Sequence, residues 1–340
     1  MHKLYHALAE RRFLAQENLL GLLELAQSRG VHPDKLLKGS SIFSEDIEDA
    51  STMLSAQQLL AIFKNAKRSF GADDGSFLLG QYLLPGNHPQ FASAILASPT
   101  LLDLIEFLQK FGFLSQPLIE FKSVYDDQNL YLQLLPVDID DYANDFLIES
   151  ISSAFFSFSR WLGVDTSSWF CLHAFKEPKY QEQFLVHYGL RPKFASHINA
   201  IIIPRASLSE QLPRGSRARF DLACKLCKQK NLPEKSSRSL SLWVYQSLQD
   251  ELSQAPGLEE LAERLELSPA SFKRHLKVEG GSYQTILDSV RRHMAIYYLH
   301  AGQLSTEEIA QKLNYHDKHN FKRSFRRWTG INPSLYLASS

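Results

Sequence analysis

The C-terminal quarter of the chain contains a degenerate internal repeat, which restricts the fold of that region more than any other feature. The stretch "LEELAERLELSPASFKRHLKVEGG", from Leu258, aligns with "TEEIAQKLNYHDKHNFKRSFRRWTG", from Thr306. An alanine and a leucine match at an offset of 48, and after one inserted residue the shared "FKR" and a glycine match at an offset of 49. Two copies of one small unit are therefore predicted between residues 255 and 340.

Each copy has the pattern of two helices joined by a short turn. In the first copy, Ser268 is expected to cap the second helix, with Pro269 at its first position, where a missing N–H costs nothing. In the second copy, Ser305 is expected to cap the first helix and Gly330 to end the second. The alanine shared by both first helices would let two steeply crossing helices approach closely. This pattern predicts two helix-turn-helix units, at about 258–281 and 305–330.

The second helix of each copy combines an apolar stripe with an exposed cationic face. Phe321, Phe325 and Trp328 follow the helical spacing of a core-facing stripe, and Phe272 and Leu276 do so in the first copy. The remaining faces carry most of the cations of a region with 12 Lys and Arg against 9 Asp and Glu, a net charge of +3. A solvated basic helix would account for one such face. A second copy with the same "FKR" favours two DNA recognition helices.

Between the copies, "SYQTILDSVRRHMAIYYLH", residues 282–300, has neither Gly nor Pro. We therefore expect one long helix that fixes the two units relative to each other.

Residues 255–338 resemble the DNA-binding domain of AraC/XylS-family transcription regulators, whose signature runs through "IAQKLNYHDKHNFKRSFRRWTGINPSLYL". Asn314-Tyr315 replaces a frequent Gly-Phe, and asparagine tolerates the left-handed turn position that glycine would occupy. By position, the resemblance implies base contacts from Ala270, Lys273, Arg274, Lys318, His319, Lys322 and Arg323. It implies phosphate contacts from Lys277, Arg291, Arg326 and Arg327, with a structural role as the alternative for Arg291.

Residues 1 to about 235 have the pattern of an α+β domain with a small antiparallel sheet. Helical stretches come first, and one of them, "SPTLLDLIEFLQKF", is expected to use Ser98 as its cap and Pro99 as its first residue. "LIEFKSVY" and "LYLQLL" alternate and are joined across "DDQN", which predicts a hairpin. A helix from about Asn144 to Leu162 and strands near 169–175 and 200–203 complete the region.

This N-terminal segment resembles the effector domain of a subgroup of AraC-type regulators. "LLELAQSRGVHPDKLL", "ASPTLLDLIEFLQKF" and "VHYGLRPKFASHINAIIIPRASL" carry the resemblance. It relates the segment to regulators of ornithine and amino-acid catabolism and, more distantly, to a virulence regulator that binds a fatty acid. The resemblance implies a small-molecule effector, with an amino acid or a fatty-acid-like carboxylate as the candidates, and a homodimer. The candidate pocket residues are Phe155, Phe158, Arg160 and Trp161, although such an aromatic stripe is more often core than pocket.

No constellation typical of an enzyme occurs in the sequence. There is no Gly-x-Ser-x-Gly, no glycine-rich phosphate loop and no His-Glu-x-x-His, and the 12 histidines lack ligand spacing. We therefore expect no catalytic residue, no metal site and no cofactor. Three cysteines, two of them in "CKLC", fit a reducing compartment better than a disulfide framework. No segment approaches the roughly 18 apolar residues of a membrane span, so a cytoplasmic protein is expected.

Three segments are predicted: an effector-sensing and dimerisation domain at 1–232, a linker with a lead-in helix at 233–254, and a DNA-binding domain at 255–340. The predicted function is an effector-controlled, sequence-specific transcription regulator, an activator or a repressor, with RNA polymerase as a partner. One alternative is a ligand-independent regulator whose N-terminal domain only dimerises or contacts polymerase. A remote alternative is a metabolite-binding or catalytic protein with a basic tether for nucleic acid. The sequence does not specify the effector, the operator or any role for the "CKLC" cysteines.

Overall fold

The computed structural model of the chain describes residues 8–70, 74–137, 143–229, 239–302 and 304–338. The chain divides into two compact units, with the boundary along the sequence near residue 238. The predicted linker "NLPEKSS", residues 231–237, lies outside the described residues. Among the described residues, none of the helices combines the length and the apolar character needed to span a bilayer.

The N-terminal unit mixes helices with two small sheets. Its elements are β1 (Arg11–Leu14), α1 (Ala15–Ser28), α2 (Pro33–Leu37), α3 (Ser44–Glu48), β2 (Met53–Ser55), α4 (Ala56–Phe70), α5 (Gly75–Leu83), α6 (Pro89–Ala97), α7 (Leu101–Phe111), the short 3-10 helix Gly112–Leu114, β3 (Ile119–Tyr125), β4 (Asn129–Pro136), α8 (Asn144–Trp161), β5 (Phe170–Leu172), α9 (Glu182–Tyr188), β6 (Ala200–Pro204), α10 (Arg205–Leu208) and α11 (Arg217–Gln229). This α+β composition, with antiparallel sheets, confirms the predicted fold class.

The larger sheet has the strand order β3-β4-β6-β5, and all its neighbours are antiparallel. The predicted hairpin is present, with Phe121 opposite Leu134. The Asp126 carboxylate shapes its turn by accepting hydrogen bonds from the backbone N–H groups of Gln128, at 2.8 Å, and Asn129, at 2.6 Å. A second sheet pairs β1 with β2.

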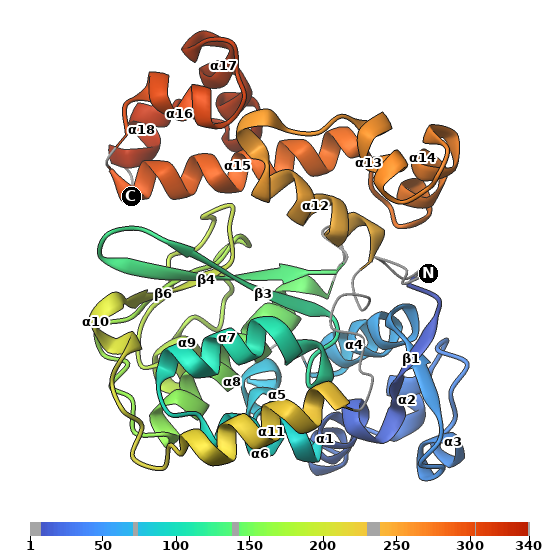
Figure 1. Cartoon of the computed structure of the whole chain (residues 1–340). Coiled ribbons are helices and arrows are strands. Elements are labelled where there is room, and N and C mark those ends of the chain that lie inside the picture. Colours follow the sequence, from blue (N-terminus) through green and yellow to red (C-terminus); the bar gives the residue numbers. More distant parts are fainter. Residues whose placement is uncertain (1–7, 71–73, 138–142, 230–238, 303, 339–340) are drawn as a thin grey trace. The chain divides into compact units, whose positions relative to one another are not determined.

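Helices α5, α7 and α8 gather on one side of the larger sheet (Figure 1). The central helix is α8, and most of its residues are buried, because it packs against both α5 and β4. Gly80 on α5 permits the close approach to α8, since a Cβ atom there would lie 2.6 Å from the backbone oxygen of Ser150. The core of the unit is therefore built around the α5–α8 contact.

The predicted cap of α7 is wrong by two residues. Thr100 is the N-cap, and its hydroxyl accepts from the backbone N–H of Asp103 at 3.1 Å. Ser98 instead ends α6, where its hydroxyl donates to the carbonyl of Ala94 at 3.2 Å. Both residues are good caps in isolation, and the end of the preceding helix decides between them.

The C-terminal unit is entirely helical in its described residues, as predicted. Its helices are α12 (Leu240–Asp250), the 3-10 helix Leu252–Gln254, α13 (Leu258–Arg264), α14 (Pro269–Val278), α15 (Tyr283–Ala301), α16 (Thr306–Lys312), α17 (Lys318–Thr329) and α18 (Pro333–Ala338). Helix α12 falls within the predicted lead-in segment and packs on α15 as part of this unit.

Candidate nucleic-acid interface

The first helix-turn-helix comprises α13 and α14. The Ser268 hydroxyl accepts from the backbone N–H of Ser271 at 3.2 Å, and Pro269 follows as the first helical residue, which confirms the predicted cap. In the turn, Glu266 has a φ of 55°. It matches Asn314 in the repeat, so the register of the repeat could have identified this second left-handed position.

Helix α14 is held by its apolar face and presents its polar face to solvent. Phe272 and Leu276 are completely buried. The residues predicted to face DNA are all exposed: Ala270, Lys273, Arg274 and Lys277. This arrangement leaves three cations on one accessible surface.

The second helix-turn-helix comprises α16 and α17. Ser305 and Glu308 form a reciprocal capping box, in which the Ser305 hydroxyl accepts from the Glu308 backbone N–H at 3.3 Å and the Glu308 carboxylate accepts from that of Ser305 at 2.7 Å. Asn314 has a φ of 58° and so takes the left-handed turn conformation expected of it. Asp317 caps α17, and Gly330 ends it with a φ of 82°.

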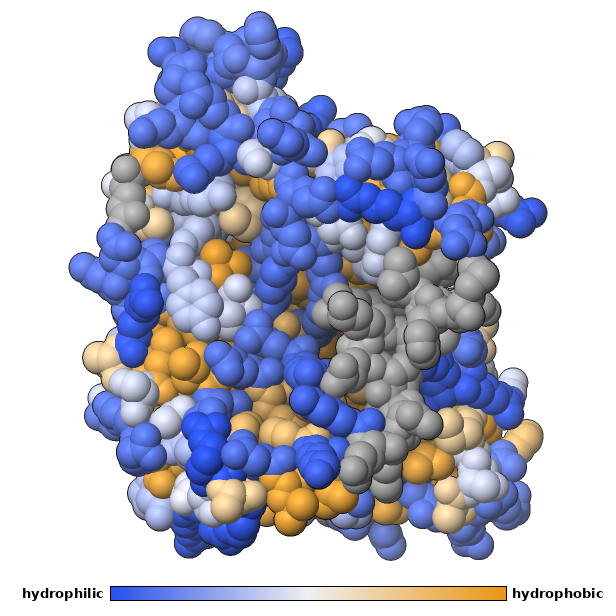
Figure 2. All heavy atoms as spheres, in the orientation of Figure 1, coloured by the Kyte–Doolittle hydropathy of each residue, from blue (hydrophilic) through white to orange (hydrophobic). Residues whose placement is uncertain are grey.

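Two aromatic residues of the predicted stripe on α17, Phe321 and Phe325, are completely buried, whereas Trp328 is half-buried. The visible surface of α16 and α17, at the top of Figure 2, consists mainly of hydrophilic residues. The exposed residues of α17 include all its predicted DNA contacts: Lys318, His319, Lys322, Arg323, Arg326 and Arg327.

Several of these cations already have partners. Lys318 lies 3.2 Å from the Glu307 carboxylate, and Arg327 lies 2.9 Å from that of Asp288. The Arg323 guanidinium donates to the side-chain oxygen of Asn320 at 2.8 Å. These pairs are exposed, so each one contributes little stability and can exchange for a phosphate or a base edge.

Arg291 occupies a different position from the other predicted phosphate contacts. From α15 its guanidinium donates to the backbone carbonyls of Leu313 and Asn314, both at 3.0 Å, and it lies 4.5 Å from the ring centre of Tyr315. Its donors are therefore directed at the turn of the second unit. This geometry favours the structural alternative for Arg291.

Helix α15 links the two helix-turn-helix units. It is one long helix of 19 residues, as predicted, and Ser282 caps its start. At a rise of about 1.5 Å per residue, it is about 28 Å long, which is comparable to one turn of B-DNA, roughly 34 Å.

The four predicted pocket residues lie in different environments. Phe155 and Phe158 are buried in the core, where Phe155 stacks on Trp169. The Arg160 guanidinium donates to the backbone carbonyls of His187 and Tyr188. Trp161 is 53% exposed. Phe155 and Phe158 thus lie in the core, and Arg160 connects α8 to the end of α9.

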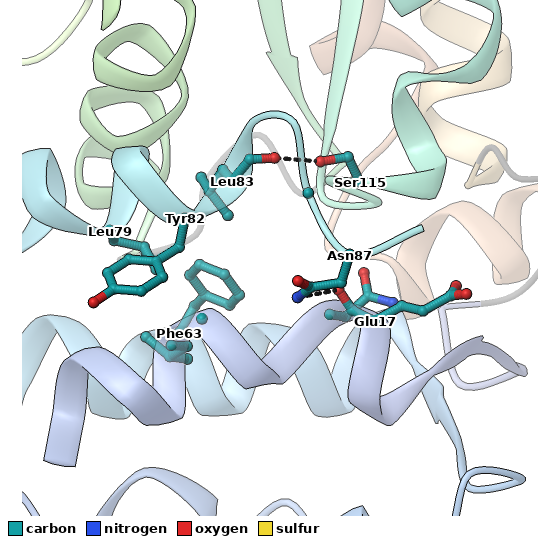
Figure 3. A pocket seen from close by; sticks show the side chains of 11 residues that line it. Glu17, Phe63, Leu79, Tyr82, Leu83, Asn87 and Ser115 are labelled. Atoms are coloured by element: carbon teal, nitrogen blue, oxygen red, sulfur yellow. Dashed lines mark hydrogen bonds between the residues drawn. The ribbon is translucent and has the colours of Figure 1, made fainter. Parts of the chain in front are cut away.

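A hollow in the N-terminal unit lies elsewhere, between α1, α4 and α5 (Figure 3). It contains about 320 Å³ of empty space, including space open to solvent. Its walls include Phe63, Leu79 and Tyr82, and the Asn87 amide donates to the backbone carbonyl of Glu17 at 3.5 Å near its rim. Sequence reasoning missed this hollow, because its walls come from separate helices.

A buried polar cluster inside the N-terminal unit also had no sequence signal. Burial raises the pKa of Glu149 to about 8. The hydroxyls of Ser76 and Tyr180 donate to its carboxyl group at 2.7 and 3.0 Å and oppose that shift. Asp145 raises the pKa further, and Lys67 lowers it. Glu149 is thus a largely neutral acid at pH 7, held by two hydroxyl groups.

Known family models match both the N-terminal and the C-terminal unit of the chain. The model "Arabinose-binding domain of AraC transcription regulator, N-term" matches residues 30–212, and the model "Helix-turn-helix domain" matches residues 261–339. The first match covers more than half of the chain. The chain belongs to the AraC family of transcription regulators. It combines an N-terminal ligand-binding domain with a helix-turn-helix DNA-binding domain.

This AraC-family regulator has relatives of similar length. It is 26% identical to the "Ornithine utilization regulator" of Pseudomonas aeruginosa over 93% of each chain. It is 23% identical to an HTH-type transcriptional regulator of Mycobacterium tuberculosis, again over 93% of each chain. Among solved structures, transcriptional regulator CdpR from Pseudomonas aeruginosa matches 94% of this chain and 96% of that chain, at 16% identity and a TM-score of 0.37. The relatives are named as transcriptional regulators rather than enzymes.

Proposed function

We propose that this AraC-family protein reads two adjacent DNA sites with α14 and α17, and that a small molecule bound to its N-terminal domain controls this binding. The observation that carries the proposal is the pair of exposed cationic helix faces attached to the two ends of one long helix. Lys273 and Arg274 would read bases for the first unit, and Lys322 and Arg323, with Lys318 and His319, for the second. Ala270 would contribute only an apolar contact.

Phosphate contacts are assigned to Lys277, Arg326 and Arg327. Arg326 has no ion-pair partner among the residues that the structure describes, so it is available for a phosphate without losing another contact. Arg327 would exchange its Asp288 partner for DNA.

The effector is proposed to be an amino acid or a related small carboxylate. The support is the likeness to a relative named for ornithine utilization. A thermal-shift screen of amino acids and fatty acids tests this directly, because a ligand that binds the native state raises the unfolding midpoint. A raised midpoint with an amino acid supports the assignment, and a rise with fatty acids alone contradicts it. No shift with any compound would favour the ligand-independent alternative.

The regulator is further proposed to act in the cytoplasm as a homodimer that contacts RNA polymerase. The dimer draws support from α11, where Leu222 is 58% and Leu226 is 40% exposed, four residues apart on one helix face. Sedimentation equilibrium of the wild type and of the Leu222→Asp/Leu226→Asp double variant tests this surface. A monomeric wild type would contradict the dimer. A double variant that still dimerises would show that α11 does not form the interface.

Selection of bound sequences from a random DNA pool tests DNA reading. The full-length protein should enrich a motif with two submotifs about one helical turn, roughly 34 Å, apart. Salt-sensitive binding without enrichment would leave only a basic surface, which would contradict the proposed base readers.

A further inference from the structure

The N-terminus of α12 is capped by a residue that is distant in the sequence. Ser239 accepts from the backbone N–H of Leu242 at 3.2 Å, as an ordinary N-cap does. The two preceding amides, of Leu240 and Ser241, instead donate to the two carboxylate oxygens of Glu279, at 3.0 and 2.7 Å. Glu279 is the residue that directly follows α14, the first recognition helix.

The chain around Glu279 is shaped to hold this contact. Gly280, with a φ of 78°, turns the backbone, and the Gly281 N–H donates to the Leu276 carbonyl at 3.0 Å. A Cβ atom on Gly281 would lie only 3.4 Å from the Ser241 hydroxyl oxygen, so the loop after α14 lies directly against the start of α12.

The electrostatics also point to a specific role. An acidic side chain at the C-terminal end of a helix opposes the helix dipole, whereas the same charge at an N-terminal end is favourable. Glu279 is poorly placed for α14 and well placed for α12. It also follows a helix predicted to bind DNA, where a negative charge repels phosphate. Its contact with α12 therefore points to a structural role.

Helix α12 is in turn fixed to the helix that links both units. The hydroxyl of Tyr245 lies 2.7 Å from Nδ1 of His293 on α15, and Val244 and Leu248 are completely buried. Glu279 therefore connects the end of α14 to α12, which is itself fixed to α15.

The second unit uses a different contact. In the register of the repeat, Trp328 takes the place of Glu279, and α17 packs directly on α15. The orientations of α14 and α17 are thus maintained by unrelated interactions.

We propose that Glu279 is a positioning residue for the first DNA-reading unit: its carboxylate fixes the angle of α14 by capping α12. The inference rests on the proposed base reading by α14. Because α12 is the first described element after residue 238, Glu279 also joins the first recognition helix to the point where the chain enters the DNA-binding unit.

The test uses full-length wild type, Glu279→Gln and the control Glu263→Gln, an exposed acid of α13 in the same unit. Each variant removes one negative charge. Affinity is measured on the selected DNA site and on two altered sites, in which either the first or the second submotif is scrambled. Each amide of α12 meets its own carboxylate oxygen, so glutamine in the same position would place its amino group against one of the two N–H groups.

Glu279→Gln is expected to weaken binding to the intact site roughly three- to tenfold, as loss of a charged hydrogen bond predicts. The loss should persist on DNA with a scrambled second submotif and disappear with a scrambled first submotif. The control should bind at least as tightly as wild type. Equal losses for Glu279→Gln on both altered sites would indicate general destabilisation and overturn the proposal. The proposal would also be overturned if Glu279→Gln gained as much affinity as Glu263→Gln. Wild-type binding without any dependence on either submotif would instead contradict the proposed function.

Discussion

Arg291 connects α15 to the turn of the second reading unit through two backbone carbonyls and the ring of Tyr315. Its planar guanidinium can donate two bonds in a fixed geometry, which a lysine ammonium cannot reproduce. The substitution Arg291→Lys therefore separates geometry from charge at a single position.

We expect Arg291→Lys to lower affinity for the intact DNA site by about 1–2 kcal/mol, since hydrogen bonds from charged donors contribute on this order. The loss should be confined to the second submotif, as measured by footprinting of each submotif separately. If Arg291 were a phosphate contact, lysine would serve nearly as well. Unchanged affinity and an unchanged footprint would therefore contradict a structural role for Arg291.

We expect Glu149 to make the stability of the N-terminal unit dependent on pH. Its pKa is about 8 in the folded protein because it is buried, against about 4.3 in an unfolded chain. The buried site favours the neutral carboxyl group over its ionised form, so ionisation destabilises the fold. The stabilisation is therefore complete below about pH 4.3 and is lost as the pH rises towards 8, with a total on the order of several kcal/mol.

Glu149→Gln should remove this dependence, because an amide does not ionise. Urea unfolding of both proteins from pH 5 to 9 checks it. The variant is expected to gain stability relative to wild type as the pH rises, with little further change above pH 8. A difference between the two proteins that stays constant across this range would show that Glu149 does not titrate there.

At the scale of elements, the α5–α8 contact illustrates what sequence periodicity can and cannot predict. The helical pattern from Asn144 identified α8 nearly to the residue. The tight approach of α5 depends on Gly80, which faces Ser150, Ser153 and Ala154 across the interface. No periodic pattern indicates which helix a glycine will meet.

Gly80→Ala should destabilise the N-terminal unit by about 1–3 kcal/mol, because the added methyl group would force the two helices apart. Gln81→Ala, an exposed change on the same helix, should be neutral or slightly stabilising, since alanine has the better helix propensity. Thermal unfolding monitored by circular dichroism measures both variants. Equal midpoints for the two would show that the interface can absorb the methyl group.

At the scale of the whole molecule, the chain has 37 basic and 37 acidic residues, so its net charge predicts no affinity for DNA. We therefore expect DNA binding to depend on the local cations of α14 and α17. Each phosphate contact should release condensed counterions and contribute about 0.9 to the slope of log affinity against log salt.

Arg326→Ala should accordingly reduce this slope by about one, with similar losses on specific and random DNA. Arg323→Ala should cost about 1–3 kcal/mol on the selected site alone, because a base contact discriminates between sequences. Binding titrations at several salt concentrations separate the two effects. Parallel losses for both variants on both kinds of DNA would invalidate the division into base and phosphate contacts.

Short-range patterns were sufficient for the two helix-turn-helix units, their serine caps, the left-handed Asn314 and the hairpin of β3 and β4. Helical periodicity, capping and turn chemistry act over a few residues, so a single sequence displays them directly. The same locality explains the error at Ser98, where two adequate caps lie two residues apart and the end of α6 selects Thr100.

Only the tertiary structure shows which residues from distant segments contact each other. Glu279 meets the amides of α12 from 38 and 39 positions along the chain, and Glu149 meets Ser76 from 73 positions away. Arg291 and the aromatic residues of α8 were recognised as notable residues, but their partners were not. A pattern in one segment shows which of its faces is apolar or charged, whereas the group that meets this face depends on how distant segments fold together.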